Sequence, residues 1–428
     1  MNEHFNTILH SVFSIMKYNM NNEFSYWMGV AVFLFLSYYS ISQNNSSLIY
    51  VLAENSDKLP LTTDMIKVDG EPDQIYINAN TNLSYVVSTL SNSISIINLT
   101  ENYVTDVIKN RNLNSMPTKI MAINPNTNRI YLIEDPMEDK HVISVIDGKT
   151  FKNLRNPIYI EDELDSITVN PKTGIVYVTG GNDNFTLYTI NDNMSKAIVN
   201  KIPIPKPNTI EINPHNNKIY LPTNDNGTFV IDGNTTYGID YNSTTNSFSS
   251  YNIAINPTND KVYELNDDAS KVLVINSSNK FGNIITSFTS GNSSDGTFGI
   301  AVDANSDLVY TTNPEYNTIS MLNGTSGLIT QIPVGQFPVS ISVNPNTGLV
   351  YVANQKSKSV TIINPTTINK EDLTKSIQYM KKSGIEVKRN PSSIAVDSSS
   401  NLIYVGNEYS NIVSIIGSVH LTGFNSLL

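Results

Sequence analysis

Short runs of apolar residues alternate with polar, turn-forming residues along most of the chain. In the stretch from residue 344 to residue 364, Asn344-Pro345 can open a turn, and Gly348 can adopt positive φ without a steric penalty. Two strand-forming runs, Leu349–Val352 and Val360–Ile363, follow on either side of a polar break. Because two strands cannot bury a core alone, this pattern predicts a hairpin that belongs to a larger sheet.

The same turn-and-tyrosine segment recurs eight times. Each copy begins with Asn or Asp, carries Asn, Asp or Gly at its fifth position, and ends in one of eight tyrosines: Tyr85, Tyr131, Tyr177, Tyr220, Tyr263, Tyr310, Tyr351 and Tyr404. The spacing runs from 41 residues, between Tyr310 and Tyr351, to 53, between Tyr351 and Tyr404. A four-stranded propeller blade takes about 40 to 50 residues. Since Asn, Asp and Gly tolerate left-handed backbone best, the fifth position predicts a tight hairpin with positive φ.

Each copy contains the pattern of four strands. An alternating run such as "VSISVN" precedes the turn, the tyrosine run follows it, and runs such as "VTIIN" and "ITQIPVG" supply a third and a fourth strand. Four antiparallel strands repeated around an axis define a β-propeller, an all-β fold with short, protected edges. Residues 62–72 have the pattern of a fourth strand and the start of a blade, so we expect the N-terminal strand to complete the last blade.

Two segments carry a family resemblance. "VYVANQKSKSVTIIN" and "IYVGNEYSNIVSII", with "VGQFPVSISVNPNTG" ahead of the first, resemble the YVTN-type β-propeller repeat, a family that includes archaeal surface-layer and other exported proteins. The resemblance covers residues 71 to 417, and copies one, five and six depart from the motif. It implies an exported propeller, commonly of seven blades. Because this chain has eight tyrosine anchors, we predict eight blades and keep seven as the alternative.

An uncharged apolar stretch, residues 25–42, precedes the repeats and is bounded by Trp27 and Tyr38-Tyr39. It predicts an N-terminal hydrophobic helix that is either a cleaved signal peptide or a transmembrane anchor. We therefore divide the chain into a leader (1–24), this segment (25–42), a linker (43–61) and the propeller (62–428). Either form of the segment predicts an extracytoplasmic propeller, secreted or anchored at the cell surface, with the membrane as a partner if the helix is uncleaved.

The composition excludes several kinds of active site and binding partner. The 428 residues include no cysteine, which excludes disulfides, thiolate metal sites and a cysteine nucleophile. The net charge of −11 argues against nucleic acid as a partner. The histidines, which are His4, His10, His141, His215 and His420, show no paired metal spacing, and no G-x-S-x-G or H-E-x-x-H motif is present.

The candidate ligand face lies just before the predicted first strand of each copy, where propeller loops converge. The residues there are Asp73, Thr118, Asp165, Asn208, Tyr251, Phe298, Val339 and Ser392. The two carboxylates could form an acid–base pair or bind a cation, whereas solvated loop residues are the simpler interpretation. Loops after the tyrosines add an acidic rim of Glu134, Asp135, Glu138, Asp139, Asp183, Asp225, Asp267, Asp268, Glu315 and Glu408. We predict no cofactor, and calcium stays open although no D-x-D-x-D-G loop is present.

Two function classes remain. The sequence favours a non-enzymatic binding or scaffolding module at the cell surface, with a surface protein or a glycan as partner. The alternative is a propeller enzyme of the lactonase, lyase or quinone-dependent oxidoreductase type with an axial active site. Convergence of carboxylates or histidines at the axis would distinguish the enzyme from the binding module.

Overall fold

The structure, a computed structural model, describes the part of the chain from residue 62 to residue 417. Within it, residues 110, 114–118, 138–139, 183, 194–196, 224–226, 233–234, 239–249, 267–270, 278–282, 290–298, 328 and 366–383 are left out. The chain divides into two units, residues 1–61 and 62–428, and the predicted hydrophobic helix over residues 25–42 lies outside the described residues. No helix in the described part is long and apolar enough to cross a membrane.

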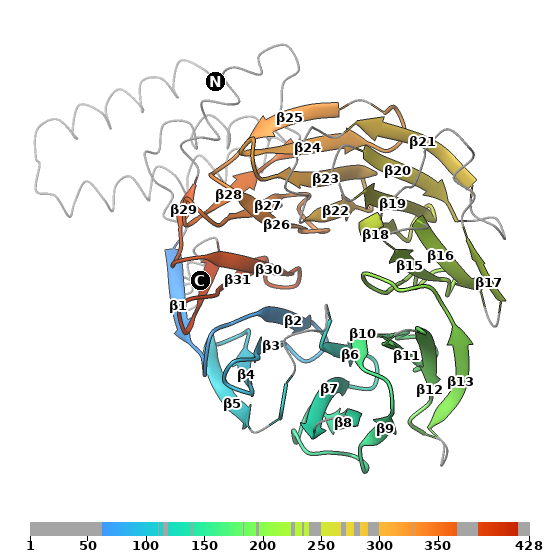
Figure 1. Ribbon diagram of the computed structural model, residues 1–428. Helices are drawn as coiled ribbons and strands as arrows, with labels where there is room; N and C mark the ends of the chain where they lie inside the picture. The colour runs from blue at the N-terminus through green and yellow to red at the C-terminus, as the bar shows by residue number, and fades with distance from the viewer. Residues whose placement is uncertain are drawn as a thin grey trace, which may run out of the picture. The chain divides into compact units, whose positions relative to one another are not determined.

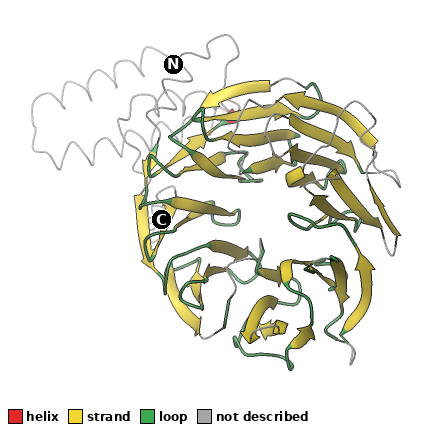
Figure 2. Cartoon of the chain, viewed as in Figure 1, coloured by secondary structure: helices red, strands yellow, loops and turns green. Residues whose placement is uncertain are grey.

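The described residues form eight four-stranded antiparallel sheets. Figures 1 and 2 show these sheets arranged around a central axis. Blades 1 to 4 contain β2 (Gln74–Asn78), β3 (Leu83–Ser88), β4 (Ser93–Asn98) and β5 (Tyr103–Lys109); β6 (Met121–Asn124), β7 (Arg129–Met137), β8 (Lys140–Asp147) and β9 (Ile158–Ile160); β10 (Leu164–Val169), β11 (Val176–Gly180), β12 (Thr186–Ile190) and β13 (Ile198–Pro203); and β14 (Glu211–Ile212), β15 (Ile219–Thr223), β16 (Gly227–Asp232) and β17 (Thr235–Gly238).

The second half of the ring repeats the arrangement. Blades 5 to 8 contain β18 (Ser250–Asn256), β19 (Lys261–Asn266), β20 (Lys271–Asn276) and β21 (Asn283–Thr289); β22 (Ile300–Asp303), β23 (Leu308–Asn313), β24 (Thr318–Asn323) and β25 (Ile329–Pro333); β26 (Pro338–Val343), β27 (Val350–Asn354), β28 (Ser359–Ile363) and β29 (Ile385–Glu386); and β30 (Pro391–Asp397), β31 (Leu402–Asn407), β32 (Ile412–Gly417) and β1 (Thr62–Lys67). The predicted all-β, eight-bladed propeller is confirmed, and the seven-bladed alternative is wrong.

Blade 8 closes the ring because it combines the two ends of the propeller. β1 pairs antiparallel with β32 along its whole length, from Thr62 opposite Gly417 to Lys67 opposite Ile412. The N-terminal strand is therefore the outermost strand of the last blade, as the run at residues 62–72 indicates. Closure of this kind leaves the sheet ends covered and ties the start of the propeller to its end.

The eight repeat tyrosines lie on the second strand of successive blades. Seven of the eight are almost fully buried, and Tyr177 is half-buried against blade 4. Apolar residues of the same strands pack with them between neighbouring sheets. Burial raises the pKa of Tyr85, Tyr131 and Tyr351 to about 12, so these hydroxyls stay protonated at neutral pH. The tyrosines are thus packing residues of the blade interfaces.

The turn between strands one and two has one geometry in all eight blades. Its first residue is a buried Asn or Asp, whose Oδ1 accepts the backbone N–H two residues ahead at 2.9 to 3.2 Å. The fifth residue has a φ between 52° and 72° in every copy, which confirms the sequence prediction. A short side-chain turn followed by a left-handed residue explains why only Asn, Asp and Gly occupy these positions.

These turns also join neighbouring blades. At five junctions, Nδ2 of the first-position Asn donates to Oδ1 of the fifth-position Asn or Asp of the next blade at 2.8 to 3.0 Å. Asn78 to Asn128 and Asn344 to Asn401 are two examples. We call the side of the ring with these turns the turn face. The opposite side, formed by the connections from strand two to three and from strand four to the next blade, is the loop face.

Blade 2 departs from the repeat on the loop face. Its middle strands β7 and β8 have 9 and 8 residues, whereas the middle strands β3 and β4 of blade 1 have 6 each and those of blade 3 have 5 each. The hairpin of blade 2 therefore extends further than its neighbours and carries Glu134, Asp135 and His141. An elaboration of one blade in a regular ring marks this region as a candidate for function.

Candidate functional site

The sequence-predicted ligand positions share one structural feature. Asp165, Tyr251, Val339 and Ser392 each fall at a register shift at the start of the innermost strand of their blade, where two residues face one on the partner strand. A β-bulge of this kind re-aims a side chain and is common near functional sites. The prediction that these residues stand just before strand one is corrected by this finding, since they lie within the strand.

The remaining predicted positions have different surroundings. Asp73 lies before β2, and its Oδ2 accepts the backbone N–H of Thr89 at 2.7 Å and the hydroxyl of Thr89 at 2.5 Å. The backbone N–H of Asn208 donates to the carbonyl of Pro222 at 2.7 Å. Asp73 thus orders the hairpin of its own blade. Thr118 and Phe298 lie outside the described residues, as does the side chain of Tyr251.

Asp165 is the predicted residue with the most unusual electrostatics. Burial raises its pKa to about 6, and the neighbouring Glu163 adds to the rise while Lys206 opposes it. A carboxyl with this pKa exchanges protons near neutral pH, which is a property of acid–base residues. Asp73 and Asp165 belong to blades 1 and 3, and no contact joins them among those that the structure describes.

The axial end of the loop face holds a separate polar cluster. The ammonium of Lys119, at the start of blade 2, forms an ion pair with Glu211 at the start of blade 4 and donates to the carbonyl of Ile210 at 3.2 Å. The hydroxyl of Tyr76 donates to Gln74 in blade 1, and burial together with the Glu211 charge raises the Tyr76 pKa. One carboxylate and one ammonium meet here, and both side chains are about a third exposed, at 31% and 30%. Such a pair contributes little stability.

A shallow, wide-open cleft lies between blades 1 and 2 on the loop face. Its volume is about 380 Å³, and it is lined by Asn92, Asn112, Leu113 and Asp135. Asn92 Oδ1 accepts the backbone N–H of Leu113 at 2.8 Å, and the carbonyl of Asn112 accepts the N–H of Asp135 at 2.9 Å. These bonds hold the wall from blade 1 against the long hairpin of blade 2.

Charged groups pair around this cleft. His141 Nδ1 lies 2.6 Å from Asp135 Oδ1, and the Arg111 guanidinium lies 3.7 Å from Glu134 Oε1 and donates to Asn153 Oδ1 at 3.0 Å. Glu134 is almost fully buried. Burial raises the Glu134 pKa, and this rise is opposed by a hydrogen bond from the hydroxyl of Ser144 and by the charge of Arg111. The cluster thus combines a histidine–carboxylate pair, a buried acid and an arginine beside an open cleft.

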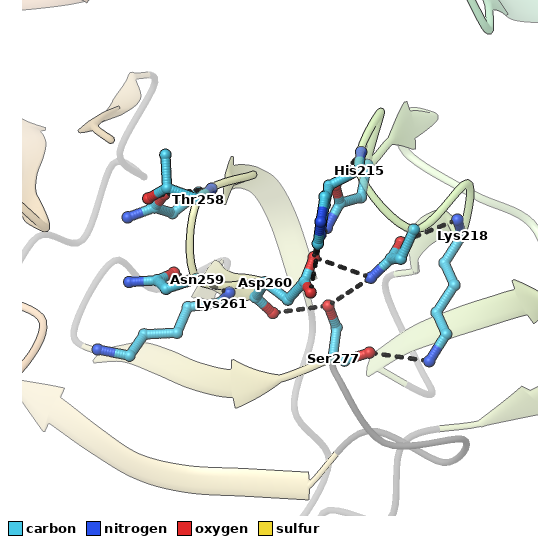
Figure 3. A network of polar contacts seen from close by, with 10 residues as sticks. His215, Lys218, Thr258, Asn259, Asp260, Lys261 and Ser277 are labelled. Carbon is cyan, nitrogen blue, oxygen red and sulfur yellow. Dashed lines mark hydrogen bonds and ion pairs between the residues drawn. The ribbon is translucent and has the colours of Figure 1, made fainter. Parts of the chain in front are cut away.

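The second described histidine belongs to the turn face. His215 Nδ1 lies 3.1 Å from the Asp260 carboxylate, and Ser277 donates its hydroxyl to the carbonyl of Asp260 at 2.6 Å (Figure 3). The Lys218 ammonium crosses from blade 4 to the carbonyl of Ser277 at 2.8 Å. These contacts connect the turns of blades 4 and 5. We therefore assign His215 to the junction between blades.

Sequence reasoning named three residues of this region without connecting them. Glu134 and Asp135 were predicted as part of an acidic rim and His141 as an isolated histidine, whereas the structure brings Asp135 and His141 together. Arg111, Asn92 and Asn112 were missed. A signal was present, because the run from Arg129 to Asp147 is longer than the corresponding run of other copies. Of the other rim residues, Glu408 accepts a hydrogen bond from Asn390 at 2.6 Å, and Glu138, Asp139, Asp183, Asp225, Asp267 and Asp268 lie outside the described residues.

Metal binding has no built site in the described part of the chain. No group of three or more His, Asp or Glu side chains there lies close enough to hold a metal ion. The prediction that calcium could bind stays a prediction. The fold and the site together define an eight-bladed β-propeller with a polar cleft between two blades of its loop face.

Comparisons with known proteins agree with the fold. No family model matches the chain, and no curated protein sequence matches it. A solved structure titled hydrazine synthase, from Kuenenia stuttgartiensis, is similar with a TM-score of 0.52 and 14% identity, over 71% of this chain and 96% of that chain. The Cps50 (Swd1) β-propeller domain of Myceliophteria thermophila is similar with a TM-score of 0.51 and 10% identity, over 68% of this chain and 96% of that chain. At these identities the likeness shows the fold alone.

Proposed function

We propose that this chain is an extracytoplasmic, non-enzymatic binding or scaffolding module that contacts a surface protein through its loop face. The observation that carries the proposal is an arc of exposed side chains over blades 6, 7, 8 and 1. Tyr316, Tyr409 and Leu90 lie in the strand two to three hairpins of blades 6, 8 and 1, and their exposed fractions are 56%, 58% and 77%. Blades 6, 7, 8 and 1 follow one another around the ring.

Cations accompany the aromatic rings of this arc. The Lys356 ammonium lies 4.0 Å from the ring centre of Phe337 in blade 7, and the Arg389 guanidinium lies 5.9 Å from that of Tyr409 in blade 8. Both distances fall within the range of a cation–π interaction. Tyrosine, phenylalanine and arginine are enriched in protein interfaces, and the aromatic rings bury a large area with little loss of side-chain freedom. The arc therefore favours a protein partner over a small solute.

Export is supported by the sequence. The apolar stretch over residues 25–42 precedes the repeats, and the YVTN-type resemblance implies an exported protein. Fractionation of the producing cells tests this part of the proposal. We expect the protein in the membrane or extracellular fraction, and an unprocessed form in the soluble cytoplasm would contradict export.

Binding is tested with labelled full-length protein in lipid nanodiscs, added to intact producing cells that lack the gene. Replacing Tyr316 and Tyr409 by serine removes the two aromatic contacts, and we expect the cell-bound fraction to fall at least about tenfold. The matched control replaces Tyr103 and Tyr159 by serine, since these tyrosines are exposed at 49% and 64% on the outermost strands of blades 1 and 2. Equal loss in both double variants would overturn the proposal.

The chemistry of the partner is tested on the same cells. If the partner is a protein, protease treatment of the cells abolishes binding, whereas periodate oxidation of their glycans leaves binding intact. The opposite result would overturn the protein partner and assign the arc to a glycan.

A further inference from the structure

The cations of the exposed arc lie close together on blades 7 and 8. Lys356 and Lys358 lie in the hairpin between β27 and β28, and Lys388 and Arg389 lie in the connection from β29 to β30. All four side chains are exposed. The backbone N–H of Val387 donates to the carbonyl of Lys358 at 2.9 Å, so the two segments are bonded to each other. We call Lys356, Lys358, Lys388 and Arg389 the cationic patch.

The positive charges of this patch are not neutralised within the described part of the chain. No carboxylate there forms an ion pair with a member of the cationic patch, whereas Lys109, Lys119 and Lys261 each pair with one. Acidic side chains outnumber Lys and Arg in the sequence, 38 to 27, so the composition does not explain a group of cations without carboxylate partners. Like charges on neighbouring segments repel each other, and an anionic partner would relieve this repulsion.

Two members of the patch are held in place before any partner binds. The Lys356 ammonium lies 4.0 Å from the ring centre of Phe337, and the Arg389 guanidinium lies 5.9 Å from that of Tyr409. The backbone N–H of Lys356 also donates to the carbonyl of Gln336 at 3.1 Å. Because these contacts already restrict the two side chains, a partner that binds them loses less conformational entropy.

The charge changes sign at the next junction of the ring. Burial raises the pKa of Glu408 in blade 8, the charges of Asp73 and Glu71 at the start of blade 1 add to the rise, and a hydrogen bond from Asn390 opposes it. An anionic chain that continued past blade 8 would therefore meet three carboxylates. The net charge of −11 also repels long polyanions. The arc thus favours a short acidic stretch.

An apolar or aromatic side chain lies on each side of the patch along the ring. Tyr316 of blade 6 is 56% exposed and Leu90 of blade 1 is 77% exposed. An extended chain covers about 3.3 Å per residue, against 1.5 Å in a helix, so a short extended segment reaches across several blades.

We propose that the exposed arc binds an extended segment of the partner protein that has acidic residues at its centre and apolar residues at both ends. The acidic residues contact the cationic patch, and the apolar residues lie against Tyr316 and Leu90. This inference rests on the proposed function, because it describes the partner of the same surface.

The first test measures the binding of full-length protein in nanodiscs to the cells that lack the gene, at about 50 mM and about 500 mM salt. Lys358→Glu with Lys388→Glu reverses two charges and leaves both cation–π contacts in place. We expect this double variant to bind about tenfold more weakly than the unmodified protein at the lower salt concentration and about twofold more weakly at the higher one, because salt screens exposed charges. The matched control is Lys149→Glu with Lys172→Glu, two exposed turn-face positions, and its binding should change by less than about twofold.

The second test adds a competing peptide at about 1 mM, a concentration suited to weak binding. The probe is a capped hexapeptide, Leu-Asp-Glu-Asp-Glu-Leu, and its control is the amide counterpart, Leu-Asn-Gln-Asn-Gln-Leu. We expect the acidic peptide to displace at least about half of the cell-bound protein and the amide peptide to displace almost none.

Three outcomes would overturn the acidic segment. These are equal binding by the two lysine double variants, failure of the acidic peptide to compete better than the amide peptide, and binding that weakens in the Lys358 and Lys388 variant but survives protease treatment of the cells, which would assign the patch to an anionic glycan. Thermal unfolding of each variant is measured alongside, so that binding is compared only between folded proteins. If serine at Tyr316 and Tyr409 abolishes binding while the lysine variants bind normally, the acidic segment is wrong and the proposed function stands. If the serine variant binds normally, the proposed function itself is wrong.

Discussion

The two faces of the propeller differ in how strictly the chain repeats itself. On the turn face, all eight copies place a buried Asn or Asp at the first position and a positive-φ residue at the fifth. On the loop face, the hairpins differ in length and in side chains, from the long β7–β8 hairpin to the exposed Tyr316 and Tyr409. The sequence is therefore repeated where hydrogen bonds join the blades, and it varies where the surface is free to contact other molecules.

The difference has a physical reason. A turn-face asparagine is buried and satisfies both a backbone N–H and a neighbouring side chain, so its replacement leaves polar groups without partners in a dry interface. A loop-face hairpin is held by its own strand pairing, so its tip tolerates change at little cost. The turn face therefore holds the blades together, and the loop face is where we place the arc of exposed side chains that contacts a partner.

The largest expected effect is at Asp307, the fifth-position residue of blade 6. Its carboxylate accepts hydrogen bonds at 2.5 to 3.2 Å from five side chains: Asn256, Asn259, Lys261, Tyr263 and Thr325. Asp307→Ala leaves the mostly buried Lys261 without its carboxylate, and we expect a loss of about 3 kcal/mol in the free energy of unfolding. Denaturant titration measures it. Asp106→Ala, at an exposed site, is the control, and an equal shift in both variants contradicts the account.

Asp307 should also make the stability of the folded protein sensitive to acid. Burial alone would raise the pKa of Asp307, but hydrogen bonds from Lys261 and Tyr263, with others from Asn259 and Asn256, lower it to about 2. The stabilisation is therefore present above the unfolded pKa of about 3.9 and is lost as the pH falls from there toward 2. Unfolding free energies measured from pH 5 to pH 2 should fall less steeply in Asp307→Ala than in the unmodified protein.

The next effect tests backbone geometry alone. Gly348 occupies the fifth position of blade 7 with a φ of 69°, and an added Cβ would lie 3.8 Å from Asp303 Oδ2, an ordinary contact. Gly348→Val should cost about 2 kcal/mol, because a β-branched residue disfavours this conformation. Lys172→Val, at an exposed turn position in blade 3, should cost about 0.3 kcal/mol. Matching denaturant midpoints for the two variants would show that the turn is not conformationally constrained.

On the loop face, Asp165 should behave in the opposite way. Its pKa is raised to about 6 by burial, so the folded state holds the proton more tightly than the unfolded chain does. The stabilisation of the folded state by this bound proton is complete below about pH 4 and is lost as the pH rises through 6. Asp165→Asn should gain about 1 kcal/mol at pH 7, after allowance for solvent screening, and almost nothing near pH 4. A gain that does not change with pH would mean that ionisation is not its cause.

The smallest effect is a repair of the turn face. Nδ2 of Asn124 in blade 2 is buried and has no hydrogen-bond partner among the described residues, because the facing fifth position is Gly174. Gly174→Asn supplies an acceptor at a residue whose φ of 72° suits asparagine. We expect a gain of about 0.5 kcal/mol. In a double-mutant cycle, Asn124→Ala should abolish this gain, and an undiminished gain would exclude the predicted bond.

The fold could be predicted from the sequence because the residues of each blade lie close together along the chain. The turn residues, the tyrosine run and the strand alternation all fall within about 50 residues, and the eight anchors give the blade count directly. The bonds between turns could not be predicted, since partners such as Asn344 and Asn401 lie 57 residues apart and their alignment depends on how the blades pack. The fifth-position Gly174 and Gly348 were predicted as conformational equivalents of Asn, and they are, but they also interrupt the chain of side-chain bonds.

The candidate site was less accessible to sequence reasoning. Asp165 was selected for its place before a strand, and the bulge that re-aims it is a property of strand pairing. Asp135 and His141 match no known motif, because their contact depends on the length of a hairpin rather than on a fixed spacing. Arg111 and Asn112 lie in the connection between blades, where the repeat offers no pattern to compare.

The separation of roles between the two faces can be tested by the cell-bound fraction of full-length protein in two variants with known thermal stability. Asn256→Ala removes turn-face bonds to the N–H of Thr258 at 3.0 Å and to Asp307 at 2.9 Å. We expect this variant to bind cells as the unmodified protein does at temperatures below its lowered unfolding temperature. We expect the variant with serine at Tyr316 and Tyr409 to unfold normally and to bind cells no longer. Normal binding by the tyrosine variant, or lost binding by folded Asn256→Ala, would contradict this separation of roles.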